Sequence, residues 1–335
     1  MRRYLVTGGI AAIVIAVFAV VLPRIANYGE VWEALRQMSP TSLAWLIGAA
    51  VLNLLTFPPP WMAAVPGLSF RRAMVMTQAA TAASTVLPGG DVVGMGTQFA
   101  MLKSWDVPAQ SATLGVVVTG AWNQMVNVAF PVAAVVLLAF QGGAPHQLVV
   151  AAVIGSLILA AMIGAFVALL ARERNAWWMG ATAGRAVAWI TALVRRPRQP
   201  HWGDDVVSFR THTLALVRKR WPHLTITTIA GHITVYLVLL AAVRAVGVDG
   251  SDVTAIEVFA AWSFIRIISA IPITPGGLGV VELGLTGIMV AMGGQRAPVV
   301  AATLVYRALT MIPPIALGGI CLAWWRQRHA GASPA

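Results

Sequence analysis

Five ionisable residues lie inside apolar stretches that are long enough to reach deep into a bilayer. They are Asp91, Glu257, Arg266, Glu282 and Arg307. A charge at that depth is costly, so such residues face a water-filled cavity or pair with one another. Arginine suits bidentate contact with phosphate. We therefore expect the two arginines to hold a lipid phosphate, while one of the acids receives an amine head group, takes a proton or neutralises an arginine.

The same residues have structural explanations that the sequence leaves open. Glu282 and Arg307 can form an ion pair that only pins the surrounding backbone, and Arg266 can extend to the membrane surface. Glu257 lies near the predicted outer edge, where water reaches it. His232 falls inside another apolar run, with Tyr236 one helical turn later. We expect a hydrogen-bonded core histidine there, with a proton relay as the alternative.

Apolar runs make up most of the sequence around these residues. Of the 335 residues, 59% are hydrophobic and 10% are charged, whereas about 25% are charged in a typical soluble domain. A helix needs about 20 apolar residues to cross the roughly 30 Å hydrocarbon core. We predict full spans at 4–22, 42–64, 109–140, 147–171, 224–243 and 298–324. Because the runs are continuous rather than alternating, the predicted fold class is an all-α integral membrane protein and not a β-barrel.

Two further apolar stretches, 73–102 and 253–293, are each interrupted by Pro-Gly-Gly. Proline removes a backbone donor and glycine costs backbone entropy, so both end helices. Most arms are too short to cross comfortably, so we predict two re-entrant hairpins whose broken tips are buried or line a wet cavity. Two pairs of short tilted spans are the alternative. The tip residues are Pro88, Gly89, Gly90, Thr274, Pro275, Gly276 and Gly277.

The basic residues are distributed unevenly between the two sides of this map. With Met1 inside, 17 of the 23 Lys and Arg residues are cytoplasmic, 4 lie outside and 2 lie within apolar runs. The positive-inside rule then places both termini in the cytoplasm. Residues 172–221 form a basic, Trp-rich cytoplasmic segment, either amphipathic helices on the anionic inner leaflet or an ordinary loop. Residues 23–40 are predicted to lie on the outer surface. These loops explain the net charge of +12, so no nucleic acid partner is expected.

The two interrupted stretches also resemble each other. In each, Val-Val and an acid, Asp91 or Glu282, follow the Pro-Gly-Gly within a few residues. The arrangement span–hairpin–span at 42–140 recurs with opposite orientation at 224–324. Inverted repeats with broken helices near the midplane are typical of secondary transporters. We predict a single polytopic domain over residues 1–335, in which the basic segment connects the two repeats.

Several motifs resemble the lysyl-phosphatidylglycerol synthase transmembrane-region family, the flippase-like part of bacterial aminoacyl-phospholipid synthases. The most specific is Pro272–Glu282, which reads Pro-Ile-Thr-Pro-Gly-Gly-Leu-Gly-Val-Val-Glu, followed by Leu304–Arg307; Leu68–Arg72 and Leu87–Gly90 are similar to the family's first half. The resemblance covers roughly 40–325 and implies movement of a phospholipid or lipid-linked head group between leaflets. The full synthases carry a soluble aminoacyl-transfer domain after this region. The sequence stops shortly after its last predicted span, so synthase activity is not expected.

The predicted function is a flippase or transporter in the cell membrane that works through a cavity between the two hairpins. Its expected partners are membrane phospholipids or a lipid-linked substrate, with a second copy of the chain or a synthase as further partners. A membrane-embedded lipid transferase, or an accessory subunit of one, is the first alternative, and a structural or assembly protein is the second. The sequence has no Gly-x-x-x-x-Gly-Lys-Ser/Thr motif for nucleotides. We predict no catalytic residue, no cofactor and no metal.

Overall fold

The computed structural model describes residues 36, 38–86, 90–141, 146–193, 202–269 and 275–329. Within these residues the regular secondary structure is entirely helical. Five helical segments are long and apolar enough to cross a membrane: Pro40–Ala64, Ala109–Phe140, Ala152–Ala171, Val206–Ala245 and Arg296–Arg328. They confirm an all-α membrane protein and coincide with five of the predicted spans. The other predicted span, 4–22, and nearly all of the segment 23–40 lie outside the described residues.

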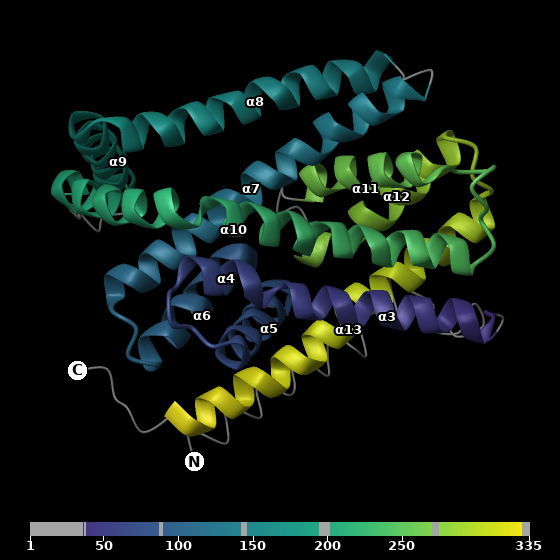
Figure 1. Cartoon of the computed structure of the whole chain (residues 1–335), viewed down its shortest axis with the longest axis horizontal. Helices are drawn as coiled ribbons and strands as arrows, with labels where there is room; N and C mark the ends of the chain where they lie inside the picture. Colours follow the sequence, from purple (N-terminus) through teal and green to yellow (C-terminus); the bar gives the residue numbers. More distant parts are fainter. Residues whose placement is uncertain are drawn as a thin grey trace.

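The long helices run side by side along the longest axis of the molecule (Figure 1). They are α3 (Pro40–Thr56), α7 (Ala109–Phe140), α8 (His146–Ala171), α10 (Trp202–Ala245) and α13 (Arg296–His329). The short helix α4 (Pro58–Ala64) directly follows α3 and completes the first described span. Proline at position 131 stays inside α7, which continues through it.

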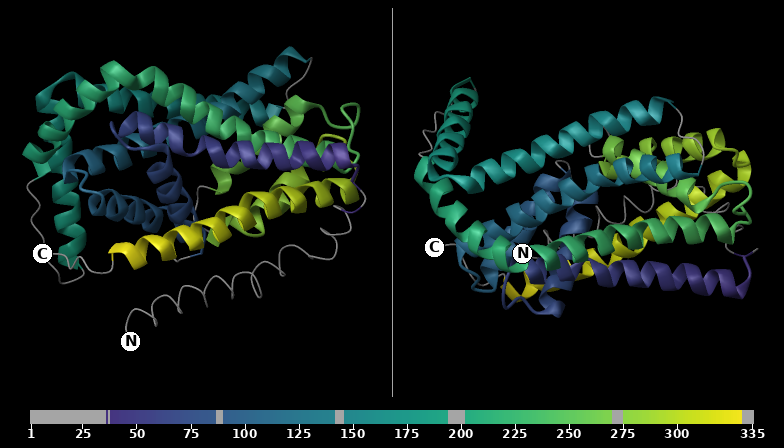
Figure 2. Two further views of the ribbon diagram at one scale, coloured as in Figure 1. Left: turned by 60° about the horizontal axis from the view of Figure 1, so that its bottom comes forward. Right: turned by 45° about the horizontal axis from the view of Figure 1, so that its top comes forward.

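The basic segment 172–221, for which the sequence predicts amphipathic helices or an ordinary loop, is helical over its described residues from Glu173 onward. Its first part forms α9 (Glu173–Leu193), which packs against α8 and α10 at one end of the long helices (Figures 1 and 2). Its last part, from Trp202 onward, belongs to α10, which continues through Pro222 into the predicted span. At about 1.5 Å per residue, a helix of 44 residues is about 66 Å long and extends well beyond a hydrocarbon core of about 30 Å. The second half of the segment is therefore the beginning of a membrane helix.

Both interrupted stretches are broken where the sequence predicts. The first consists of α5 (Phe70–Val86) and α6 (Gly90–Ser104), and the second of α11 (Ala255–Ser269), the 3-10 turn η3 (Pro275–Gly277) and α12 (Val280–Ala291). The four α-helices have 12 to 17 residues, which is about 18–25 Å and less than a full crossing. The helices of each pair pack together. The two pairs lie toward opposite ends of the long helices (Figures 1 and 2), an arrangement that fits hairpins entering from opposite sides.

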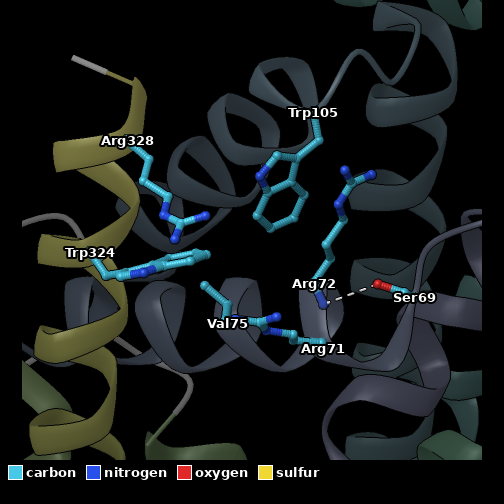
Figure 3. A pocket seen from close by; sticks show the side chains of 7 residues that line it. All are labelled: Ser69, Arg71, Arg72, Val75, Trp105, Trp324 and Arg328. Carbon is cyan, nitrogen blue, oxygen red and sulfur yellow. Dashed lines mark hydrogen bonds between the residues drawn. The ribbon is translucent and has the colours of Figure 1, made fainter.

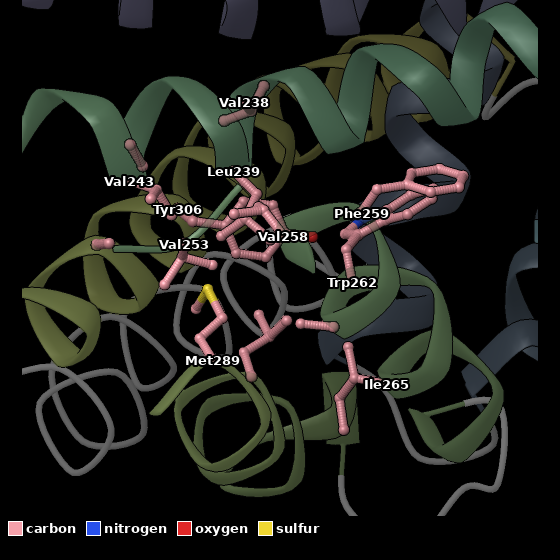
Figure 4. Packing of buried hydrophobic residues seen from close by; sticks show 14 of the residues in the cluster. Val238, Leu239, Val243, Val253, Val258, Phe259, Trp262, Ile265, Met289 and Tyr306 are labelled. Carbon is pink, nitrogen blue, oxygen red and sulfur yellow. The ribbon is translucent and has the colours of Figure 1, made fainter. Parts of the chain in front are cut away.

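Each helix pair is surrounded by its own hydrophobic cluster. The cluster around α11 and α12 includes Phe259 and Trp262, whose rings stack at 5.8 Å, and Phe130 of α7 meets Trp262 edge-on at 5.3 Å. Figure 4 shows Phe259 and Trp262 in one cluster with Leu239 of α10 and Met289 of α12. The other cluster joins α5 and α6 to α4, α7 and the end of α13. The rigid packing of aromatic and aliphatic side chains holds each broken pair in place.

Gly318 sets the distance between α13 and the first helix pair. A Cβ atom at Gly318 would lie 2.1 Å from the backbone oxygen of Gln78 in α5 and 2.6 Å from the Cβ of Ala82. Backbone atoms cannot move aside as a flexible side chain does. We expect Gly318→Ala to lower the free energy of unfolding in detergent by about 1–3 kcal/mol, the usual cost of overpacking.

Gly48→Ala is the matched control, because nothing lies within 4 Å of a Cβ at Gly48 on the exposed face of α3. Alanine is favoured over glycine in a helix, so this variant should be about 0.5–1 kcal/mol more stable than the wild type. Equal responses of the two variants would contradict the close packing of α13 on α5.

Candidate functional site

Glu282 and Arg307 form a buried clamp at the broken tip of the second helix pair. The Nε of Arg307 donates to Oε1 of Glu282 at 2.5 Å, and both side chains are about one-tenth exposed. The other carboxylate oxygen of Glu282 accepts from the backbone N–H of Gly279 at 2.7 Å. The Nη2 of Arg307 donates to the backbone oxygen of Gly276 at 2.8 Å. The ion pair thus joins α12 to α13, and its two partners also hold the backbone at Gly276 and Gly279.

The clamp supports the structural explanation of this pair. Both oxygens of the Glu282 carboxylate and two nitrogens of the Arg307 guanidinium are committed to neighbouring groups. A buried pair gains from such additional hydrogen bonds, because they offset the cost of removing both charges from water. The geometry favours a pair that fixes the backbone, and binding of a lipid phosphate by Arg307 stays the other hypothesis.

The broken ends of the two helix pairs touch. A Cβ at Gly276 would lie 3.2 Å from Cγ2 of Thr85, in the last turn of α5, and 3.2 Å from Cε of Met311 in α13. Gly276 and Gly277 have φ angles of 60° and 67°, in the left-handed region that side chains other than glycine rarely adopt. Gly90 begins α6 with a φ of 47°. Glycine is therefore needed for the chain to turn where the two tips meet.

Three of the predicted tip residues, Pro88, Gly89 and Thr274, lie outside the described residues. Pro275 is described as the first residue of η3, without its side chain. The described contact between the two broken ends that the structure shows is that of Gly276 with Thr85.

A cavity of about 450 Å³ with a mixed polar and apolar lining lies beside the first helix pair, and residues of α3 to α7, α10 and α11 line it. Its polar lining consists of hydroxyl, amide, imidazole and guanidinium groups from Thr56, Thr77, Thr81, Ser84, Gln98, Thr119, Asn123, Gln124, Thr228, His232 and Arg266. Most of them belong to helices that are apolar enough to span a membrane or to the helix pair packed against those helices. So many polar groups at that depth are tolerated where they line a wet space.

Arg266 belongs to this cavity, and Glu282 and Arg307 are not among its described lining residues. Its Nε donates to Oδ1 of Asn127 at 2.9 Å, and its guanidinium lies 5.2 Å from the ring centre of Trp262. Both contacts orient the guanidinium of a residue that the sequence left free to reach the surface. Among the described lining residues, Arg266 is the only one that is charged at every physiological pH.

His232 is the second polar residue that the sequence singled out inside a span, and it is buried. Its Nε2 lies 2.8 Å from Oδ1 of Asn123, and its ring meets Phe130 edge-on at 5.7 Å. These contacts fit the expected hydrogen-bonded core histidine. Its neighbour Tyr236 points elsewhere, because its hydroxyl donates to the backbone oxygen of Ala255 at 2.8 Å.

Glu257, by contrast, has a local structural role. Glu257 caps the start of α11: its Oε2 accepts from the backbone N–H of Thr254 at 2.7 Å and from the Thr254 hydroxyl at 2.9 Å. The backbone N–H of Glu257 donates back to that hydroxyl at 3.2 Å, which completes a capping box. Asp91 stands in the first turn of α6, and its side chain lies outside the described structure.

Sequence reasoning missed the amides of α7. Asn123 and Asn127 hold His232 and Arg266, and Gln124 accepts from the side-chain amide of Asn127 at 3.2 Å. Asn127 follows Gln124 by three residues and Asn123 by four, and these spacings place it beside both on the helix surface. Three uncharged amides within five residues near the middle of the run 109–140 were the available signal. Among the described residues, no group of three or more His, Cys, Asp and Glu side chains could hold a metal ion.

Comparison with known proteins gives one result. No curated protein matches the chain. The family model described as "Lysylphosphatidylglycerol synthase TM region" matches residues 9–318, which include every described helix from α3 to α12 and most of α13. The match covers most of the sequence and confirms the resemblance that the Pro272–Glu282 and Leu304–Arg307 motifs indicated. The chain is a multi-pass membrane protein that belongs to the lysylphosphatidylglycerol synthase transmembrane-region family.

Proposed function

We propose that the protein moves a phospholipid, or the head group of a lipid-linked substrate, between leaflets by exposing the cavity around Arg266 to each side in turn. The observation that supports this proposal is a cavity of about 450 Å³ among membrane helices, with many polar groups and an oriented guanidinium in its wall. Ligand cavities usually measure about 300–1,000 Å³, so a lipid head group fits. A guanidinium is the side chain best suited to hold its phosphate.

The two helix pairs provide the part that would move. Their broken tips touch at Gly276 and Thr85, and the first pair also lines the cavity through Thr81, Ser84 and Gln98. A shift of one tip against the other would change which side of the cavity is closed. Paired broken helices serve this purpose in many transporters.

Leaflet exchange in vesicles that contain only this protein tests the proposal. Fluorescent phosphatidylglycerol is placed in both leaflets, and a membrane-impermeant reductant then bleaches the outer one. The protein should allow bleaching of the inner pool, and Arg266→Gln should slow it about tenfold or more, because a hydrogen bond to a charged group contributes about 1.5–3 kcal/mol. Lys219→Gln, a change at an exposed position of α10 outside the cavity, should leave the rate unchanged. Protein-containing and empty vesicles that bleach alike would overturn the proposed function.

We further propose that the protein lies in the cell membrane, with the basic end of the molecule on the cytoplasmic side. Segments that the charge bias assigns to this side lie close together: Gln110 donates to Ser208 at 3.1 Å, and Trp325 donates to Ser104 at 2.7 Å. In a Cys321→Ser background, a cysteine at the exposed position Gln141, just after α7, should react with an impermeant maleimide added outside intact cells. A cysteine at Lys219 should react only after the cells are opened. The reverse pattern would invert the orientation.

A further inference from the structure

A second pocket, of about 430 Å³, lies at the end of the molecule that carries the C-terminal end of α13. It is lined by three arginines and two tryptophans, Arg71, Arg72, Arg328, Trp105 and Trp324, together with Ser69 and Val75. Figure 3 shows Arg328 and Trp324 on α13 at one side and Arg72 with Trp105 at the other. None of these residues lines the cavity around Arg266. The pocket is therefore a separate site.

The tryptophan rings position the three guanidinium groups. Arg328 lies 4.5 Å and Arg71 lies 5.8 Å from the ring centre of Trp324, and Arg72 lies 5.7 Å from that of Trp105. The walls of the pocket are also fixed to each other, because Trp325 next to Trp324 donates to Ser104 next to Trp105 at 2.7 Å. Stacking on an aromatic face restricts a guanidinium while leaving its N–H groups available to an anion.

Within the part of the chain that the structure describes, no acidic group balances the charge of this pocket. In the described structure the ion pairs are Arg210 with Glu173 and Arg307 with Glu282, so no described carboxylate lies within 4.0 Å of the three arginines. Arg71 and Arg72 also stand in the first turn of α5, where the helix dipole disfavours positive charge. A bound anion would reduce the repulsion among the three arginines and would interact favourably with the N-terminal end of the α5 dipole.

The surroundings indicate which anion. Tryptophan and arginine at the ends of spanning helices mark the level of the lipid head groups, and Trp324 and Arg328 stand in the last turns of α13. Arginine forks match the oxygens of a phosphate. We propose that this pocket binds the phosphodiester of an anionic phospholipid from the leaflet on the basic side, as a site distinct from the central cavity. The proposal concerns binding and does not depend on transport.

Lipid binding to the purified full-length protein tests this site. In neutral detergent, native mass spectrometry with added phosphatidylglycerol gives the dissociation constant. An exposed ion pair contributes up to about 1 kcal/mol, or about fivefold in affinity. Arg72→Gln and Arg328→Gln should therefore each weaken binding about fivefold, and the double variant about 25-fold. Arg326→Gln removes the same charge from the same helix outside the pocket and should have little effect.

Two comparison ligands distinguish the sources of the phosphate. Phosphatidylcholine, which has the same phosphodiester without net charge, should bind more weakly and respond less to the variants. Inorganic phosphate should compete poorly, because it lacks the acyl chains. Because Arg72 and Arg328 are exposed, the variants should unfold at the wild-type temperature in detergent. Equal phosphatidylglycerol binding by the wild type and the folded double variant would overturn the proposal, and displacement by inorganic phosphate at equal affinity would assign the pocket to a soluble anion instead.

Discussion

Arg307→Met should destabilise the folded protein by about 3–5 kcal/mol, because it leaves the carboxylate of Glu282 buried without its partner. The loss also removes the hydrogen bond to the backbone oxygen of Gly276. Unfolding in detergent, followed by circular dichroism or by tryptophan fluorescence, measures the change. Arg296→Met is the matched control, since Arg296 is exposed in the first turn of the same helix and should cost less than about 0.5 kcal/mol.

The double variant separates a clamp from a binding site. Glu282→Gln with Arg307→Met removes both charges, so most of the stability should return, to within about 0.5–1.5 kcal/mol for the hydrogen bond that stays broken. Because neither residue is a described part of the cavity lining, the stable double variant should also transport lipid. A stable but inactive double variant would show that Arg307 binds the substrate, which is the other interpretation that the sequence allows.

Gly276→Leu should abolish leaflet exchange while the protein still inserts into the membrane. The backbone at Gly276 has a φ of 60°, which costs a non-glycine residue about 1–2 kcal/mol. The added side chain would meet Thr85 and Met311, which lie 3.2 Å from the position of a Cβ, and overpacking adds about 1–3 kcal/mol. The strain falls where the two helix pairs touch, so their contact is what the variant breaks.

Gly287→Leu serves as the control for this experiment. Gly287 lies in α12, close in sequence to the tip, and nothing is within 4 Å of a Cβ there. Exchange rates are compared after correction for the amount of folded protein. Normal exchange by folded Gly276→Leu would show that the contact between the tips plays no part in transport.

Local chemistry made the helices and their interruptions predictable. The length of an apolar run can be compared directly with the thickness of a bilayer, and Pro-Gly-Gly ends a helix whatever surrounds it. The length of α10 was not predictable in this way, because hydropathy detects only its apolar part. Helical continuity from Trp202 through Pro222 depends on packing against α9 and other helices, which the local sequence does not contain.

The candidate site was predictable only in part, for a similar reason. A charge in an apolar run is visible in the sequence, so Arg266, Glu282 and Arg307 could be selected. Their separation into a cavity residue and a clamp depends on contacts between helices that are distant in the chain, such as that of Arg266 with Asn127. An asparagine costs far less than a charge on a hydropathy scale, and the amides of α7 therefore did not stand out.

The packing of α13 against α5 and α6 has a consequence for biosynthesis. Ser104 and Trp325, which are hydrogen-bonded in the folded protein, are 221 residues apart in the chain, and Gly318 must reach the backbone of Gln78. When the ribosome has delivered the first helix pair to the insertion machinery, the helix that covers it has not been made. The face of α5 at Gln78 and Ala82 must therefore be covered by lipid, water or the translocon until α13 arrives. Contacts over such distances form late, and truncation before α13 should leave the first helix pair inserted without its native neighbour.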